Sequence, residues 1–265
     1  MERSELAIKI TALCENTSCQ SDILSEHGLS LYIEACGHRI LFDMGQTDMF
    51  ADNAQTLGIC LESVDIAVLS HGHYDHGGGL ARFFGINQTA PVYLTKTAFE
   101  PHYNGTEKYI GLDTSVMTNC RIVMTESKTV ISDGLTLLTI PDGKLKYPIR
   151  HGGLTKKTAA GYVADDFGHE QYLLIEEHGK RILISGCSHR GIENIMCAFS
   201  PDVLVGGFHF SKMPICDELA KTAKELESYK TAYYTCHCTG TAQFEFMKEY
   251  ISDLNYLSAG QTVEI

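Results

Sequence analysis

The stretch His71-Gly72-His73-Tyr74-Asp75-His76 carries three imidazoles and a carboxylate directly after the apolar run Val64–Leu69. Imidazole and carboxylate are ligands that Zn²⁺, Mn²⁺ and Fe²⁺ accept at neutral pH. If the chain is extended through His73, then His71 and His73 project from the same face, as two ligands of one ion must. Asp75 and His76 then lie where the backbone turns, and they can serve a second ion. The stretch therefore predicts a metal site with His71, His73, Asp75 and His76 as ligands.

Strand and helix patterns alternate on both sides of this stretch. The first half of the chain predicts strands at Ala7–Leu13, Ser30–Ala35, His38–Phe42, Asp65–Leu69 and Pro91–Leu94, and helices at Thr47–Leu57 and Gly78–Phe84. The second half predicts a hairpin of Tyr172–Glu176 with Arg181–Ser185, strands at Val203–Val205 and Thr231–Thr235, and helices at Ser211–Tyr229 and Ala242–Tyr250. The order of elements indicates an α/β protein whose two halves are built alike.

Polar residues follow several of these strands at their carboxyl ends. The histidine stretch follows Asp65–Leu69, and Cys187 and His189 follow the second hairpin strand. His209 follows Val203–Val205, and His237 follows Thr231–Thr235. Open α/β sheets usually bind ligands at the carboxyl ends of their strands. We therefore expect these residues to meet in one site.

The stretch at 71–76 resembles the HxHxDH signature of the metallo-β-lactamase superfamily. Further blocks that resemble this superfamily occur in the same order along the chain. They are Glu15-Asn16-Thr17, Leu41-Phe42-Asp43-Met44-Gly45, Ser185-Gly186-Cys187-Ser188-His189, Gly206-Gly207-Phe208-His209 and Cys236-His237-Cys238-Thr239-Gly240. Together they are similar to the subgroup that contains the archaeal dihydropterin–ribofuranosylaminobenzene phosphate synthase of methanopterin biosynthesis.

This resemblance implies a four-layer αββα sandwich of the α/β (α+β) class, which the strand and helix pattern also suits. Residues 1–265 are expected to form a single domain. The pattern loosens at about residues 97–166, and we interpret that segment as an elaboration that shapes a pocket over the metals. The resemblance also implies two divalent metal ions, with Zn²⁺ as first choice and Mn²⁺ or Fe²⁺ permitted by the same ligands.

His189 and His237 are interpreted as the remaining protein ligands. The alternative for His189 is a loop histidine that caps the helix after Gly191. In extended geometry Cys236 and Cys238 point away from a site that His237 faces, and both are interpreted either as packing residues or as residues that support the ligands from behind. Cys187 shares a face with His189 if the segment is extended, and it stands where many superfamily members have a bridging aspartate. It is either a ligand, a residue beside the metals or a buried inert thiol.

Other candidates surround the ligands. Asp43 can accept the free ring N–H of a ligating histidine and so fix its orientation. His169 and Glu170 compete for a ligand position before the hairpin, and a solvent-facing histidine is the plain alternative. His209 is a candidate for contact with substrate or for proton transfer. Lys146 and Arg150 belong to a local cluster of cations that suits an anionic substrate or a solvated face.

Composition limits the kind of protein. The chain has 265 residues, of which 44% are hydrophobic and 20% charged, so it can bury a large core. Its formal net charge of −12 argues against a broad nucleic-acid surface. There is no apolar run long enough to span a membrane, and the ten cysteines form no CxxC pair. We expect a cytoplasmic protein that acts on a small anionic molecule, and the oligomeric state stays open.

Three functions are compatible with such a site. The preferred one is a metal-dependent hydrolase in which Asp75 holds metal and orients a metal-bound hydroxide that attacks a phosphoester or carboxylic ester. The second is a transferase that joins a dihydropterin-methyl diphosphate to an aminobenzene ribofuranosyl phosphate, with the metals stabilising the departing diphosphate. The third is a non-catalytic, metal-dependent sensor, against which the intact stretch at 71–76 counts.

Overall fold

The computed structural model describes residues 7–265, and within them the strands form two large sheets and one small sheet. The first large sheet has the order β18-β1-β2-β3-β4-β5-β8. Its strands are β18 (Thr262–Glu264), β1 (Lys9–Cys14), β2 (Ser30–Ala35), β3 (His38–Phe42), β4 (Ile66–Val68), β5 (Val92–Thr95) and β8 (Ile122–Thr125).

The second large sheet comes mainly from the other half of the chain and has the order β17-β16-β15-β14-β13-β10-β9. Its strands are β17 (Leu254–Tyr256), β16 (Ala232–Thr235), β15 (Val203–Gly206), β14 (Lys180–Ile184), β13 (Tyr172–Glu177), β10 (Leu135–Leu138) and β9 (Lys128–Ser132). The expected hairpin is confirmed, because β13 and β14 pair antiparallel with Glu177 opposite Lys180.

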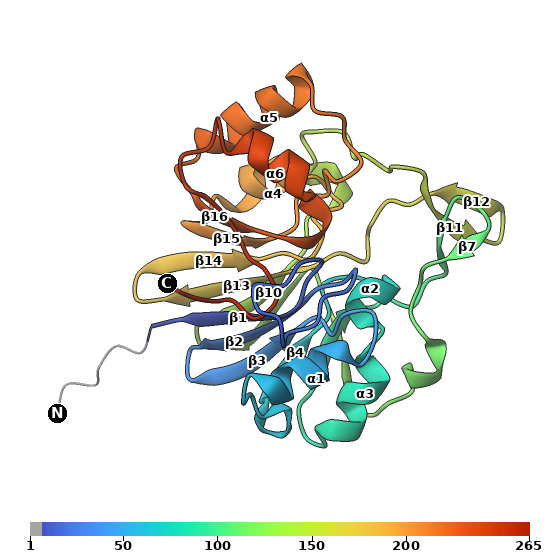
Figure 1. The fold of residues 1–265 in the computed structure, drawn as a ribbon. Helices are drawn as coiled ribbons and strands as arrows, with labels where there is room; N and C mark the ends of the chain where they lie inside the picture. Colours follow the sequence, from blue (N-terminus) through green and yellow to red (C-terminus); the bar gives the residue numbers. More distant parts are fainter. Residues whose placement is uncertain (1–6) are drawn as a thin grey trace.

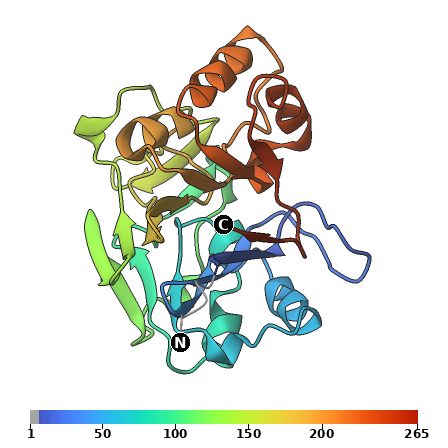
Figure 2. The ribbon, with the colours of Figure 1, turned by 90° about the vertical axis from the view of Figure 1, so that its left-hand side faces the viewer.

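The two large sheets face each other across a buried apolar layer, and helices cover their outer faces (Figures 1 and 2). Phe42 and Val68 of the first sheet share this layer with Ile184 and Val205 of the second. The helices over the first sheet are α1 (Met49–Thr56) and α3 (Leu80–Ile86), and those over the second are α4 (Ile192–Phe199), α5 (Asp217–Glu227) and α6 (Thr241–Met247). The expected αββα sandwich is confirmed.

Successive side chains along each strand point to opposite faces of the sheet, and apolar residues occupy both faces. In β3, Ile40 and Phe42 join the layer between the sheets, whereas Leu41 packs with Phe50 of α1 on the outer face. The same division occurs in β14, where Ile182 and Ile184 face the first sheet and Leu183 faces the helices. Successive side chains of a strand point to opposite faces, so an apolar run without alternation indicates burial on both.

Parallel pairing brings the carboxyl ends of the site-bearing strands to one edge. β3 is parallel to β4, and β14, β15 and β16 are parallel in turn. Backbone with positive φ follows several of these strands, at Asp43 (61°), Ser188 (58°), His209 (58°) and His237 (47°). Non-glycine residues adopt this region rarely, and such strained positions gather at functional sites.

Two expectations about helices need correction. The helix expected over Ser211–Tyr229 is shorter, because α5 begins at Asp217. Ile215 therefore lies outside the helix and is 52% exposed, although Leu219 is buried as expected. Pro214 disfavours helical backbone at Met213, and Cys216, directly before α5, is extended (φ −156°, ψ 176°).

The histidine stretch itself also contains a short helix that the sequence pattern did not reveal. It is α2 (Tyr74–Gly77), and it lies just before α3. Glycine is required at residue 78 because a Cβ there would collide with the Gln46 carbonyl oxygen. This close approach seats α2 against the loop that follows β3.

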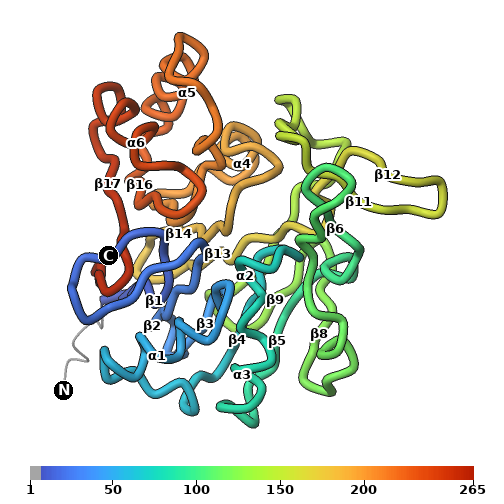
Figure 3. Tube along the Cα trace, turned by 45° about the vertical axis from the view of Figure 1, so that its right-hand side comes forward, coloured from blue at the N-terminus to red at the C-terminus, as the bar shows by residue number. Residues whose placement is uncertain are grey.

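Residues 97–166 contribute to all the sheets. The small sheet has the order β12-β11-β6-β7 and lies to one side of the sandwich (Figures 1 and 3). Its strands are β12 (Gly161–Ala164), β11 (Leu154–Thr158), β6 (His102–Asn104) and β7 (Lys108–Tyr109), whereas β8, β9 and β10 of the same segment extend the large sheets. Short 3-10 turns occur at Leu61–Ser63, Thr114–Val116, Asp142–Lys144 and His237–Thr239.

Within the described part of the chain, no helix combines the length and the apolar character needed to cross a lipid bilayer.

Candidate metal centre

Three histidines from the two halves of the chain form the first cluster of the site. One ring nitrogen from each of His71, His73 and His189 lies within 4.8 Å of the others, and all three side chains are buried. His71 Nε2, His73 Nε2 and both ring nitrogens of His189 have no hydrogen-bond partner. Buried polar atoms are normally satisfied, so these convergent nitrogens fit a bound cation.

Burial also keeps these imidazoles in the form that binds metal. It lowers the pKa values of His71, His73 and His189 well below the ordinary value, and the neighbouring histidines add to the effect. The rings are therefore neutral at pH 7. A neutral imidazole has one nitrogen with a free lone pair, which is the ligand atom.

A second cluster lies beside the first and joins α2 to the ends of β14 and β16. His76 Nε2 is 3.3 Å from His237 Nε2 and 3.1 Å from Cys187 Sγ. Asp75 Oδ2 is 3.4 Å from His237 Nε2 and 4.0 Å from His76 Nε2. Burial opposes ionisation of Asp75, yet the imidazoles of His237 and His27 beside it hold its pKa well below the ordinary value. These donors fit a second divalent ion.

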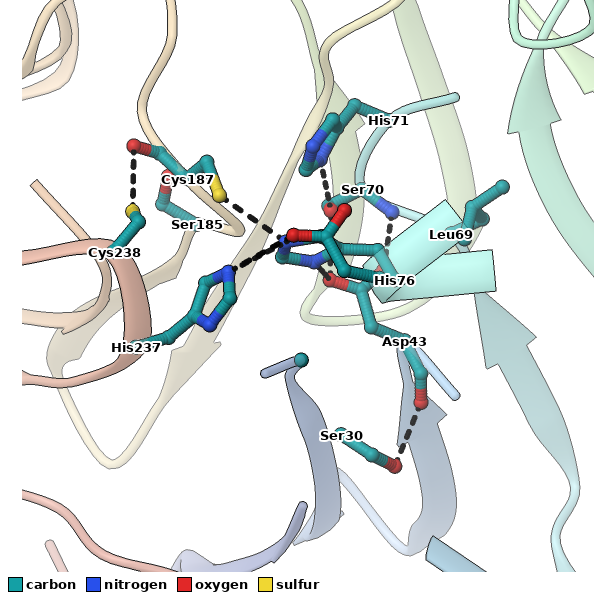
Figure 4. A network of polar contacts seen from close by, with 12 residues as sticks. Ser30, Asp43, Leu69, Ser70, His71, His76, Ser185, Cys187, His237 and Cys238 are labelled. Carbon is teal, nitrogen blue, oxygen red and sulfur yellow. Dashed lines mark hydrogen bonds and ion pairs between the residues drawn. The ribbon is translucent and has the colours of Figure 1, made fainter. Parts of the chain in front are cut away.

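Asp43 anchors the second cluster from the opposite side (Figure 4). Its Oδ2 is 2.6 Å from His76 Nδ1 and accepts a hydrogen bond from the Ser70 hydroxyl at 2.7 Å. Its Oδ1 accepts a hydrogen bond from the Ser70 backbone N–H, also at 2.7 Å. Burial lowers the pKa of His76, but the Asp43 carboxylate outweighs it and raises the pKa overall. The structure therefore places Asp43 where a carboxylate orients a ligating histidine, with Nε2 directed at the second cluster.

The expected extended geometry around Cys187 and His237 is wrong. Ser188 has positive φ, so Cys187 and His189 do not share a face: Cys187 faces His76, whereas His189 faces His71 and His73. His237 also has positive φ and begins a 3-10 turn. Cys238 therefore lies with Cys187 and His237 instead of pointing away, and its Sγ is 3.4 Å from the Cys187 carbonyl oxygen.

Glu170 supports the first cluster without joining it. Its side chain accepts hydrogen bonds from the backbone N–H of His189 at 2.6 Å, the N–H of Arg190 at 3.0 Å and the hydroxyl of Tyr172 at 2.6 Å. Burial raises its pKa, and these three donors oppose that effect. Phe167 stacks on the His189 ring with the centroids 4.4 Å apart. Glu170 and Phe167 together hold the loop that presents His189.

A third buried group, His102, Asp165 and His169, lies beside His73 and could hold an ion with it. Only His169 of this group was a candidate in the sequence, and its burial shows that the solvent-facing alternative is wrong. Asp165 Oδ2 is 2.6 Å from His102 Nδ1, and His169 Nδ1 accepts a hydrogen bond from the Gly72 N–H at 2.9 Å. Because its Nδ1 is the acceptor, neutral His169 carries its proton on Nε2, which points at Asp165 Oδ1 3.6 Å away. His169 thus supports the backbone of the 71–76 stretch. The only sequence signal was its place before the hairpin.

The remaining candidates from the sequence, His209, Arg150 and Lys146, lie outside the two donor clusters. The His209 ring is half-buried and its centroid is 4.2 Å from that of His189, so it borders the first cluster. The Arg150 guanidinium is bound by Glu193 at 2.7 and 3.1 Å and by Glu218 at 3.4 Å. Lys146 is exposed and lines a separate cavity of about 310 Å³ with Cys197 and Phe199. The structure gathers the expected metal ligands but does not bring these two cations to them.

The fold and the metal-binding geometry agree with comparisons to known proteins. Residues 26–237 match the family model of the metallo-beta-lactamase superfamily. Together with the two-sheet sandwich and the histidine clusters at its edge, this match shows that the chain belongs to the metallo-beta-lactamase superfamily.

Two proteins of one archaeal organism are similar to this chain over most of its length. The chain is 30% identical to the 7,8-dihydropterin-6-methyl-4-(beta-D-ribofuranosyl)-aminobenzene-5'-phosphate synthase of Methanocaldococcus jannaschii, covering 97% of this chain and 96% of that one. An uncharacterised protein of the same organism is 28% identical over 87% of this chain and 90% of its own.

Among solved structures, Tm1679, described as a metal-dependent hydrolase of the beta-lactamase superfamily, superposes with a TM-score of 0.85 and 31% identity, over 97% of this chain and 99% of that one. Zn²⁺-bound PqqB of Methylobacterium extorquens shares the fold alone, with a TM-score of 0.60 and 12% identity over 97% of this chain and 100% of its own.

Proposed function

We propose that this protein is a metal-dependent hydrolase that uses two divalent ions, with Zn²⁺ the first choice, on a small anionic phosphoester or carboxylic ester. The observation that carries the proposal is the pair of adjacent donor clusters at one sheet edge. Three buried histidines with unpartnered nitrogens form the first cluster, and Asp75, His76 and His237 form the second. Superfamily membership supports the same interpretation.

The chain's own groups have distinct tasks in this proposal. Divalent ions bound at the two clusters would lower the pKa of a coordinated water from about 15.7 toward 7 and polarise the bond to be broken. Asp75 supplies the carboxylate on the second cluster and is held in place by His27, whose Nε2 lies 3.1 Å from its Oδ2. Asp43 keeps the proton of His76 on Nδ1, so that Nε2 faces the site.

His209 borders the first cluster in a form that can donate a hydrogen bond. Burial and the neighbouring His237 lower its pKa to about 4, so its ring is neutral at pH 7. A neutral imidazole has one N–H donor and one acceptor nitrogen. We assign His209 the role of contacting the substrate or leaving group through that N–H, without a positive charge.

A transferase reaction is the second candidate, and two observations favour it. The full-length relative at 30% identity is a synthase, and this chain would likewise join a dihydropterin-methyl diphosphate to an aminobenzene ribofuranosyl phosphate. The donor side chains are also enclosed, with His76 0% and Asp75 8% exposed. Enclosure excludes water, and a transfer reaction requires that exclusion because water is the competing nucleophile.

The decisive experiment measures both reactions with one protein preparation. Protein loaded with Zn²⁺, or with Mn²⁺, is incubated with a panel of phosphomonoesters, phosphodiesters and carboxylic esters. In parallel it is incubated with the pterin-methyl diphosphate and the aminobenzene phosphate acceptor. Mass spectrometry follows hydrolysed and joined products, with His71→Ala as the metal-site variant and His38→Ala as the matched control.

Hydrolysis that requires metal and is lost in His71→Ala, but not in His38→Ala, supports the proposal. A joined product with the same requirements establishes transfer in its place. Turnover that is equal in His71→Ala and wild type contradicts both, because neither reaction would then depend on the site described.

A further inference from the structure

Asn16 lies in the loop after β1 and contacts two histidines at the second cluster. Its Oδ1 is 2.7 Å from His237 Nδ1, and its Nδ2 is 3.4 Å from His27 Nδ1. The Asn16 side chain is exposed, whereas His237 is buried. One amide at the surface therefore connects a buried metal-ligand candidate with an exposed histidine.

The Asn16 oxygen determines which nitrogen of His237 is free. An amide oxygen only accepts hydrogen bonds, so His237 Nδ1 must be the donor. A neutral imidazole with its proton on Nδ1 has its lone pair on Nε2. That Nε2 atom is the one that lies 3.3 Å from His76 Nε2 and 3.4 Å from Asp75 Oδ2. Asn16 thus prepares His237 as a ligand through Nε2.

The Asn16 nitrogen determines the opposite tautomer for His27. An amide nitrogen only donates, so His27 Nδ1 is the acceptor and the ring proton lies on Nε2. His27 Nε2 is 3.1 Å from Asp75 Oδ2, which makes it a donor to that carboxylate. The His27 ring also lies against the His237 ring, with centroids 4.8 Å apart. His27 therefore holds Asp75 from the solvent side.

We infer that Asn16 is a positioning residue of the second metal site, which sets His237 and His27 in opposite tautomers so that one binds the ion and the other orients its carboxylate ligand. The two ends of the amide make this possible, because one accepts and the other donates. The inference rests on the proposed two-metal function. It adds Asn16 and His27 to the site, neither of which the ligand pattern of the sequence identified.

Position and tautomer of His237 depend on different residues. The backbone N–H of His237 donates to Glu15 Oε1 at 2.6 Å, and Glu15 also accepts from the Tyr256 hydroxyl at 2.8 Å. Glu15 thus holds the His237 backbone even where Asn16 is replaced. The alternative role for Asn16 is to shape the loop, since its Oδ1 also accepts from the Gly28 N–H at 3.4 Å. A test must therefore detect tautomers as well as metal.

The experiment compares wild type with Asn16→Leu and Asn16→Asp, and uses Asn255→Leu as a matched control on an exposed asparagine. Zn²⁺ stoichiometry and the dissociation constant of each ion are measured by competition with a chelator. Nitrogen-15 NMR of the Zn²⁺-loaded proteins then reports which ring nitrogen of His27 carries the proton. The His27 signals are assigned with His27→Ala.

Asn16→Leu is expected to weaken the second ion by about 10–100-fold and to leave the first ion unchanged, as for other residues that orient metal ligands. Asn16→Asp offers two acceptor oxygens, so it keeps the bond to His237 but places a proton on His27 Nδ1, which carries none in wild type. Asn255→Leu is expected to match wild type in both measurements. A loop-shaping role predicts no such proton on His27 Nδ1.

Two results overturn the inference while leaving the proposed function intact: an Asn16→Leu variant that binds the second ion as tightly as wild type, or an Asn16→Asp variant in which His27 Nδ1 carries no proton. A wild-type protein that binds no second ion overturns the inference together with the two-metal proposal. The wild-type titration therefore separates the two failures.

Discussion

The Asp43 carboxylate lies 2.6 Å from His76 Nδ1, and both side chains are completely buried. Asp43 follows β3 and His76 belongs to α2, so the contact ties the end of one strand to the helix that follows its neighbour. The positive φ of Asp43, 61°, turns its side chain toward the histidine. The Asp43 carboxylate satisfies three donors at once, and these contacts offset the cost of its left-handed backbone.

Asp43→Asn is expected to weaken metal binding at the second cluster by about 10–100-fold. An amide has a single acceptor oxygen, so it cannot serve His76 Nδ1 and both Ser70 donors as the carboxylate does. Competition with a chelator measures the affinity. Asp65→Asn is the matched control, because Asp65 pairs with Arg39 at the surface. Equal affinities for the two variants would show that Asp43 does not orient His76.

His189→Ala and His237→Ala should each remove one ion and leave the other bound. The two histidines belong to different clusters, and each cluster keeps its other ligands when one residue is replaced. Elemental analysis after gel filtration gives the stoichiometry of each variant. His38→Ala serves as the control. A variant of either histidine that still binds two ions would contradict its assignment as a ligand.

Arg150→Met is expected to destabilise the fold by about 1–3 kcal/mol, because it leaves a buried carboxylate without its ionic partner. Glu193 is 3% exposed at its side chain, and Arg150 Nη2 approaches it to 2.7 Å. The double variant Arg150→Met with Glu193→Gln should recover part of the loss. Urea denaturation of the four proteins gives the coupling energy. A coupling energy of zero would mean that the pair does not stabilise the fold.

Cys36 is expected to react slowly with iodoacetamide at pH 8. Burial raises the pKa of its thiol to about 11, and the Glu177 carboxylate adds to the effect. Since the raised pKa keeps the thiol protonated below pH 11, alkylation should speed up by about tenfold per pH unit from pH 7 to 10. Mass spectrometry follows the rate, with exposed Cys120 as the internal reference.

Glu177→Gln tests the electrostatic part of that cause. Removing the negative charge should lower the pKa of Cys36 and accelerate its alkylation at pH 8. An unchanged rate would assign the shift to burial alone. The exposed Glu34 on β2 offers the matched Glu34→Gln control.

The sequence predicted the elements whose patterns are local. β2 and β3 occur at the expected residues, since an apolar run that ends at a glycine turn allows few other conformations. The two halves of the sandwich followed from the order of strands and helices. The histidine stretch indicated its metal chemistry because four candidate ligands within six residues have few structural uses.

Other features depended on contacts between distant segments. The loop before α5 is held by Gln243, a residue of another helix whose side chain donates to the Met213 carbonyl. The directions in which the Cys187 and His237 side chains point depend on left-handed backbone at Ser188 and His237. The alternation of side chains along a strand does not predict such backbone. No local pattern reveals that Ser188 adopts it, because the packed site holds that conformation against its intrinsic cost.

The sequence by itself therefore determined the fold class and the superfamily, and it indicated candidate metal ligands. Tertiary structure alone decided how those residues divide into two clusters and which neighbours orient them. Asn16 and His237 are separated by 221 positions, yet their side chains meet at 2.7 Å. Ligand types are properties of single residues, whereas tautomers and orientations arise from hydrogen bonds that exist only after the chain has folded.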